Sequence, residues 1–192
     1  SLKNQNKIRY HVYHLDYFRL YHSLKQNSHH NKILVGLDIS GDPRVGDLRS
    51  VLDKMTRLRS EDGIKMAIHL AEIVNPAETS AVLDTCHVGS VRLGHGTCIP
   101  PSLGGSDTCL EQLTRAGCPV ETCLSSNVVC HTVPSYREHQ ARIFHDRGIP
   151  KVGFYLEFRK FCSDIFSVLC TDDKGVFNCD LSQELRTAAE AF

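Results

Sequence analysis

The segment IHLAE places a histidine, His69, three residues before a carboxylic acid, Glu72. A histidine at the end of a strand can bind zinc, and an acid one turn further on can protonate a leaving group. Metal-assisted hydrolysis requires both functions. Taken alone, the pair is better explained as a buried strand histidine followed by a glutamate that favours the start of a helix.

A second histidine, His95, lies between two glycines in LGHGT. The glycines allow close backbone approach and predict an unhindered imidazole. Because histidine titrates near neutral pH, His95 could orient or deprotonate a metal-bound water. A turn histidine flanked by glycines explains the same pattern equally well.

The adjacent carboxylates Asp172 and Asp173 follow an apolar run in CTDDKG. They repel each other unless a positive group lies between them or they serve different roles. A metal ion could engage one, and a substrate N–H or a protonated ring nitrogen the other. The alternative is a solvated loop pair that caps the next segment, but the apolar run before it favours the functional interpretation.

Two further motifs carry weaker signals. Gly41 in DISGDP and Ser126-Asn127 in CLSSNV could place backbone or amide hydrogen bonds beside a planar ligand. Ordinary turn chemistry favours the same residue types for local reasons.

The elements that must position these residues alternate along the chain. Short apolar runs predict strands, and polar stretches of 10–15 residues between them predict helices, which is typical of βαβ units and a parallel sheet. The runs are Ile33–Ile39, Ile64–His69, Val91–Gly94, Pro119–Leu124 and Phe166–Thr171, and the helical stretches fall at about 46–60, 77–86, 107–117, 135–147 and 181–191.

The polar candidates all follow the carboxyl ends of the predicted strands, where a βα barrel builds its active site. No glycine fingerprint of a dinucleotide-binding sheet follows any strand. We therefore predict α/β architecture: a partial (β/α)8 TIM barrel of the metal-dependent hydrolase type, with about five βα units and the N-terminal strands missing. Residues 1–32 are expected to form a polar, helical segment and residues 33–192 the barrel part, with an irregular insert at about 146–165.

Composition narrows the function classes. Lys and Arg (22) balance Asp and Glu (22), which argues against nucleic-acid or anionic membrane partners, and no protein partner is evident. No run reaches the roughly 18 apolar residues of a membrane helix. Nine cysteines without a C-x-x-C pair suit a reducing compartment, so we expect a cytoplasmic protein.

In their order, the motifs LDISGDP, IHLAEI, RLGHGT, ETCLSSNV and CTDDKGVF resemble those of the adenosine deaminase family. TVPSYREH and TDDKGVF…LSQE are most similar to its adenosine deaminase-like branch, which hydrolyses N(6)-methyl-AMP to IMP and methylamine. The resemblance covers roughly residues 33–138 and 166–192. It implies a purine nucleotide or nucleoside as substrate and one zinc ion as cofactor.

The resemblance also implies a role for each candidate. His69 and Asp172 match zinc ligands, Glu72 matches the proton donor to the purine ring, and His95 matches the residue that activates the attacking water. Gly41 and Asp173 match contacts to the purine.

The sequence departs from the family pattern at one position that matters. The first strand of the family carries a His-x-His pair with two more zinc ligands, and no H-x-H occurs in these 192 residues. A catalytic zinc usually needs three protein ligands. Three hypotheses therefore stay open: a zinc deaminase of N(6)-substituted purine nucleotides, a non-catalytic truncated form of it, and another metal-dependent amidohydrolase.

Overall fold

Five parallel strands form one sheet in which the spatial order follows the chain order, β1-β2-β3-β4-β5. The computed structural model describes residues 21–23, 25–26, 36–87, 89, 91–149 and 168–192. The strands are β1 (Gly36–Ile39), β2 (Lys65–Leu70), β3 (Val91–His95), β4 (Val120–Thr122) and β5 (Val168–Leu169). All five predicted strands are confirmed among the described residues, and β2 is shifted by one residue from its apolar run. Consecutive parallel neighbours are what a stretch of βα barrel requires.

The two faces of the sheet differ in polarity because side chains alternate along a strand. In β2, Met66, Ile68 and Leu70 are buried in the hydrophobic core. On the opposite face lie Lys65 and His69, which are exposed and partly exposed. A broad hollow lies near the amino ends of β1, β2 and β3 and is lined by Gly36, Leu37, Asp38, Lys65, Met66, Ala67, Gly89, Val91, Arg92 and Pro119.

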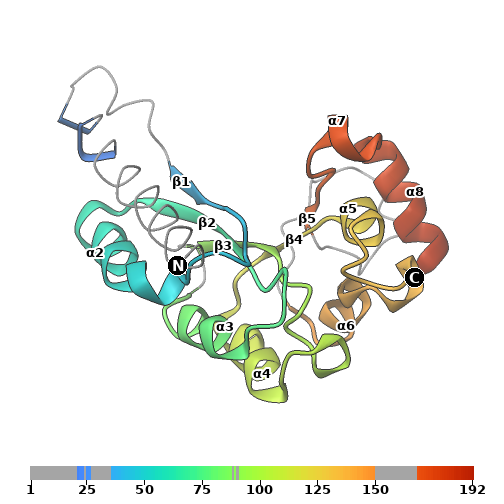
Figure 1. Ribbon diagram of the computed structural model, residues 1–192, viewed down its shortest axis with the longest axis horizontal. Helices are drawn as coiled ribbons and strands as arrows, with labels where there is room; N and C mark the ends of the chain where they lie inside the picture. The colour runs from blue at the N-terminus through green and yellow to red at the C-terminus, as the bar shows by residue number, and fades with distance from the viewer. Residues whose placement is uncertain (1–20, 24, 27–35, 88, 90, 150–167) are drawn as a thin grey trace, which may run out of the picture.

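Three helices follow β1, β2 and β3, and they lie along the same side of the sheet (Figure 1). They are α2 (Leu52–Asp62), α3 (Pro76–Leu83) and α4 (Asp107–Ala116). Short 3-10 turns, η1 (Leu48–Val51) and η2 (Pro101–Leu103), precede α2 and α4. Asn75 and Ser106 begin α3 and α4 by accepting hydrogen bonds from backbone N–H groups. Gly117 ends α4 in a left-handed conformation (φ 60°), and its N–H reaches the carbonyl of Leu113.

The C-terminal elements gather beside β4 and β5 (Figure 1). They are α5 (Leu124–Val129), η3 (Tyr136–Glu138), α6 (Gln140–Asp146), α7 (Lys174–Phe177) and α8 (Leu181–Ala191). Sequence reasoning placed Leu124 in a strand and did not expect α5 or α7. Leu124 instead begins a helix, because the buried carboxylate of Glu184 on α8 accepts hydrogen bonds from the N–H groups that a helix start leaves unpaired.

Part of the N-terminal segment packs against α2. Residues 21–23 and 25–26 are helical, and Tyr21 is buried in the core. Its hydroxyl donates to Asp62 Oδ2 at 3.1 Å, and Lys25 forms an ion pair with the same carboxylate. The rest of the helix expected in residues 1–32, and nearly all of the insert expected at 146–165, lie outside the described residues.

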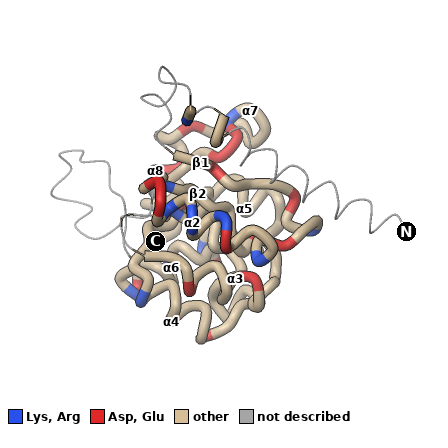
Figure 2. The backbone as a smooth tube through the Cα atoms, turned by 90° about the vertical axis from the view of Figure 1, so that its left-hand side faces the viewer, with Lys and Arg blue, Asp and Glu red and all other residues tan. Residues whose placement is uncertain are grey.

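Figure 2 shows basic and acidic residues interspersed along the described backbone, in agreement with the balanced composition. In the described part of the chain, no helix combines the length and the apolarity that crossing a bilayer demands. The eight described cysteines form no disulfide, and six of them are buried. The cytoplasmic location stays a prediction.

We expect this chain, expressed alone, to self-associate and to melt over a broad temperature range. Within the described residues β1 pairs only with β2 and β5 only with β4, which leaves both outer edges of the sheet with unpaired N–H and C=O groups. Size-exclusion chromatography with light scattering, together with calorimetry, would measure both properties. A monomer with one sharp cooperative transition would contradict this expectation.

Candidate active site

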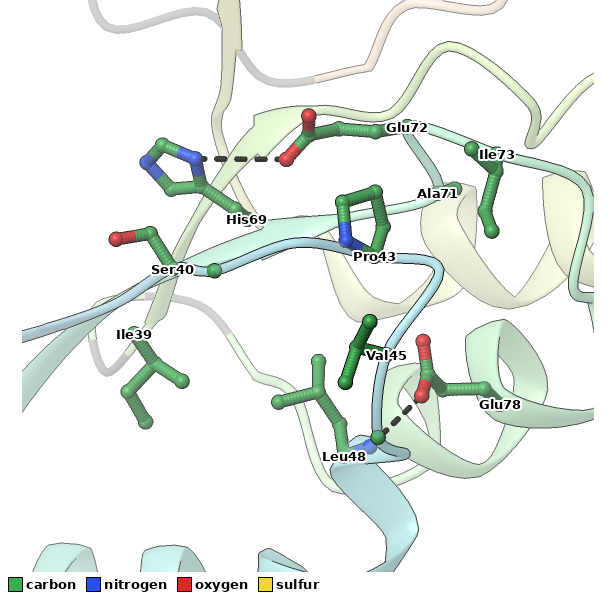
Figure 3. Close-up of a pocket in the computed structure, with 12 residues that line it drawn as sticks. Ile39, Ser40, Pro43, Val45, Leu48, His69, Ala71, Glu72, Ile73 and Glu78 are labelled. Atoms are coloured by element: carbon green, nitrogen blue, oxygen red, sulfur yellow. Dashed lines mark hydrogen bonds and ion pairs between the residues drawn. The ribbon is translucent and has the colours of Figure 1, made fainter. Parts of the chain in front are cut away.

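The carboxyl ends of β1 and β2 open into a small pocket that holds three of the predicted site residues. Gly41, His69 and Glu72 line it together with Ile39, Ser40, Pro43, Val45, Gly46, Leu48, Ala71, Ile73 and Glu78. In Figure 3 the His69 ring and the Glu72 carboxylate point toward each other across the top of this pocket. The structure thus brings Gly41 beside the proposed acid and one proposed metal ligand.

His69 lies among carboxylates. Its Nδ1 is 3.6 Å from Glu72 Oε1, and its Nε2 is 3.5 Å from Asp38 Oδ1 on β1. The interaction with the Glu72 carboxylate, with smaller contributions from Asp38 and Asp172, raises the pKa of His69 against the lowering effect of burial. Carboxylates that stabilise an imidazolium would stabilise a metal cation in the same place, so the region attracts positive charge.

A glycine of β3 sets the position of the His69 ring. Gly94 pairs with His69 across the β2–β3 ladder, and a Cβ at Gly94 would lie 3.1 Å from His69 Cδ2. Few real Cβ contacts are as short as this. A side chain at position 94 would therefore displace the ring, which explains a glycine here in terms of close approach rather than turn geometry.

His95 ends β3 in a left-handed conformation, with φ 61°. Ala71, just after β2, and Asp172, just after β5, share this conformation, which is uncommon outside glycine. The His95 side chain is buried, contrary to the unhindered imidazole predicted from its glycine neighbours. Its Nε2 lies 3.9 Å from Glu72 Oε1 and 3.9 Å from Asp172 Oδ2, and its ring stands edge-on to His69 with centroids 5.2 Å apart.

The two adjacent aspartates have different roles. Asp172 turns toward the site, and Ser126 Oγ donates a hydrogen bond to Asp172 Oδ2 at 2.7 Å. Asp173 instead accepts hydrogen bonds from the N–H groups of Gly175 and Val176 and caps α7. The structure brings Asp172 to His95, whereas Asp173 has the capping role that was the alternative interpretation of this pair.

Two cysteines lie beside Asp172. Cys123 precedes α5 and Cys170 follows β5. Interaction between the two thiols, together with burial, raises the pKa of Cys123, and the same interaction lowers the pKa of Cys170 to about 6. The composition of nine cysteines without a C-x-x-C pair predicted a reducing compartment and gave no reason to expect either thiol at the site.

A buried hydrogen-bond network fixes the backbone carbonyl of His95. Gln140 Nε2 lies within hydrogen-bonding distance of the His95 carbonyl oxygen (3.0 Å), Thr97 Oγ1 (3.2 Å) and Asn127 Oδ1 (3.1 Å). His139 Nδ1 accepts from the N–H of Ala141, so its neutral ring donates from Nε2 to Asn127 Oδ1 at 3.0 Å. Asn127, which sequence reasoning placed beside a planar ligand, is a member of this network.

The C-terminal helix also supports the site. Glu184 is fully buried, and its Oε2 accepts hydrogen bonds from Leu124 N (3.0 Å) and Ser125 N (3.3 Å) at the start of α5. Because α5 carries Ser126, Glu184 fixes the helix that orients the Asp172 carboxylate. The motif LSQE contains this residue, but only the fold shows what it contacts.

Two overlapping groups of side chains could hold a metal ion. The ligand atoms of His69, Glu72 and His95 lie within 4.8 Å of one another, and so do those of His95, Cys123 and Asp172. Neither group contains both His69 and Asp172, the two ligands implied by the family resemblance; His95 joins the groups. The donor types suit zinc, and the buried His95 Nδ1 has no hydrogen-bond partner among the described residues. The residues present therefore fit a cation at this edge of the sheet.

The position of most site residues follows from their place after the strands. Those that sequence reasoning missed are Asp38, Cys123, Gln140, His139 and Glu184. Asp38 had a signal, since it is an acid within an otherwise apolar strand run, ILVGLDI. The other four had none that local pattern could reveal, because each depends on a contact between distant segments.

Comparison with known proteins connects this geometry to a family. A sequence profile described as adenosine deaminase matches residues 18–153. The N6-methyl-AMP deaminase of Danio rerio is 39% identical over 159 residues, covering 83% of this chain and 40% of the relative. The Homo sapiens N6-methyl-AMP deaminase is 39% identical over 160 residues, covering 83% and 39%. The chain thus spans about two fifths of the length of these relatives.

Solved structures agree in fold. Arabidopsis ADAL complexed with IMP superposes with a TM-score of 0.64 at 28% identity, covering 82% of this chain and 38% of that one. The same enzyme complexed with GMP gives the same values except for 39% coverage of its own chain. The partial barrel predicted from the strand pattern is confirmed.

We expect the packing around α6 to loosen as the pH falls from 7 to 5. Burial lowers the pKa of His139 to about 4 from its ordinary 6.5. A locally unfolded α6 exposes His139 and lets it bind a proton near pH 6.5, so the folded state loses stability as the pH falls below 6.5. The loss at pH 5 should be about 2 kcal/mol. Hydrogen exchange of α6 amides, corrected for intrinsic rates, would measure it.

The amides of α4 provide the internal control, since no buried histidine belongs to that helix. Equal changes in α4 and α6, or none in α6, would argue against a role for His139.

Proposed function

We propose, from the premise that this chain belongs to the adenosine deaminase family, that it supplies acid–base groups for hydrolysis of a purine C6–N bond. The proposed substrate is N(6)-methyl-AMP, which reacts with water to give IMP and methylamine. Two relatives with 39% identity are N6-methyl-AMP deaminases, which supports this choice over adenosine. Structural neighbours solved with IMP and GMP support a purine nucleotide as the ligand.

One observation carries the proposal. His95 Nε2 lies 3.9 Å from both Glu72 Oε1 and Asp172 Oδ2, so groups that follow β2, β3 and β5 meet at one point. These distances are longer than a hydrogen bond and leave the imidazole nitrogen available to a reacting molecule. Three such groups do not need to meet in order to stabilise a sheet.

The groups divide the proton transfers between them. His95, as general base, accepts a proton from the water whose oxygen adds to C6. Glu72 donates a proton to the neighbouring ring nitrogen, which relieves the charge that develops on the ring. The proton held by His95 then leaves with methylamine as the C6–N bond breaks, and the proton of the C6 hydroxyl returns to Glu72 as the carbonyl forms, which restores both groups.

His69 and Asp172 would hold the zinc ion that the family resemblance implies, with Ser126 fixing the Asp172 carboxylate. When bound, zinc lowers the pKa of a water molecule toward neutrality. Gly41, beside His69 and Glu72, and Asp173, at the start of α7, are the proposed purine contacts.

A non-catalytic chain is the second candidate. The two further histidine ligands of the family have no counterpart in these 192 residues, and three protein ligands are usual for catalytic zinc. Metal content and turnover decide between the two.

If the proposal holds, Glu72→Gln should lower kcat for methylamine release from N(6)-methyl-AMP by about 10²–10⁴-fold, because the amide cannot donate the proton. Glu111→Gln, on the exposed surface of α4, is the matched control and should leave kcat unchanged. Adenosine, tested in parallel, should be the poorer substrate. Equal loss in both variants, or turnover of cyclic amides or esters alone, would refute the assignment.

Zinc content gives an independent measurement. The deaminase predicts stoichiometric zinc that survives dialysis in the wild type and that binds more weakly in His69→Ala, since removing one ligand leaves a carboxylate-rich pocket without its imidazole. Metal analysis by plasma emission would report the ratio. Metal-free wild-type protein would support the non-catalytic chain.

A further inference from the structure

The ends of β3, β4 and β5 bring together three different kinds of metal ligand. His95 offers an imidazole nitrogen, Cys123 a thiol and Asp172 a carboxylate, and their ligand atoms lie within 4.8 Å of one another. The set shares Asp172 with the ligands implied by the family resemblance but adds a sulfur, which those ligands lack. It therefore calls for its own explanation.

His95 needs a partner. Its side chain is about 6% exposed, its Nδ1 is buried without a hydrogen bond among the described residues, and its Nε2 lies 3.9 Å from the closest carboxylate oxygens. A buried polar group without a partner costs free energy. The Nε2 atom, which faces the Glu72 and Asp172 carboxylates, is open to a cation.

Asp172 is already oriented for a cation. Its backbone holds a left-handed conformation (φ 54°), and Ser126 Oγ fixes its Oδ2 at 2.7 Å. A carboxylate held by a neighbouring donor presents its remaining lone pairs in a fixed direction, as metal-binding carboxylates commonly do. The side chain is 28% exposed, which leaves a path for an ion from solvent.

Cys123 supplies the soft ligand. It is 4% exposed and immediately precedes α5, so its sulfur lies between the ends of β4 and β5. A tetrahedral ion about 2.0–2.3 Å from N, O and S ligands brings these atoms to within about 3–4 Å of one another.

We propose that His95, Cys123 and Asp172 form a binding site for a thiophilic divalent cation such as Zn²⁺, Co²⁺ or Cd²⁺. Binding forms a metal–sulfur bond and releases the thiol proton to solvent, with no change of oxidation state. The bound cation occupies the His95 nitrogen that the proposed deamination uses, so this site and water activation compete for one imidazole. The proposal goes beyond the proposed function and does not depend on it.

Cobalt provides the test because a thiolate ligand gives Co²⁺ a sulfur-to-metal charge-transfer band in the near ultraviolet. We expect the band when metal-free full chain is titrated with Co²⁺, and its loss in Cys123→Ser. Cys170→Ser, which changes the neighbouring thiol, should keep the band, as should His69→Ala. No band in the wild type, a band that persists in Cys123→Ser, or a band lost only in Cys170→Ser would overturn the assignment.

Zinc X-ray absorption of the wild-type chain keeps the proposal testable if Cys123→Ser does not fold. One sulfur scatterer at about 2.3 Å per zinc is expected, and a shell of nitrogen and oxygen alone would overturn it. The two proposals fail separately. A cobalt band without methylamine release would contradict only the deaminase, and turnover without a sulfur ligand would contradict only this site.

Discussion

Parallel pairing of β2 with β3 is the constraint on which the site depends. The ladder sets His69 opposite Gly94 and Leu70 opposite His95, so both histidines reach the same edge of the sheet one step apart. Gly96 N–H donates to the Leu70 carbonyl and Cys98 N–H to the Ala71 carbonyl, which holds the two chain reversals together after the strands end. Paired residues share a face of the sheet, so the left-handed conformation of His95 (φ 61°), and not the ladder alone, lets its ring approach His69.

Electrostatics then decide what this edge attracts. Asp38, Glu72 and Asp172 surround two imidazoles, and the polar edge lies directly above an apolar core, where charges interact more strongly than in water. A proton and a metal ion compete for the same lone pairs of His69. Without a metal ion, the neighbouring carboxylates favour the protonated form of His69, and its pKa is raised.

The fold could be predicted from the sequence more completely than the site could. Apolar runs separated by amphipathic stretches predicted all five strands, because burial in a parallel sheet demands continuous apolar segments. The same rule failed at Leu124, where Glu184, 60 residues away, stabilises a helix start instead.

At the site, His69, Glu72, His95 and Asp172 follow strand ends, so their convergence could be predicted from position alone. Asp173 could not be assigned in this way, because capping α7 and contacting a ligand favour the same residue type. Cys123 was missed because a cysteine in an apolar context has the same pattern whether it packs or binds.

The capping of α5 by Glu184 makes the chemistry of the site depend on the last twelve residues of the chain. Glu184 lies on the final helix, its carboxylate holds the first turn of α5, and α5 carries the serine that steadies Asp172. A premature stop codon or a proteolytic cut ahead of Leu181 would leave every predicted site side chain in the polypeptide but would remove the support that orients Asp172. The integrity of the carboxyl terminus therefore has to be established before an inactive preparation is interpreted in terms of its catalytic residues.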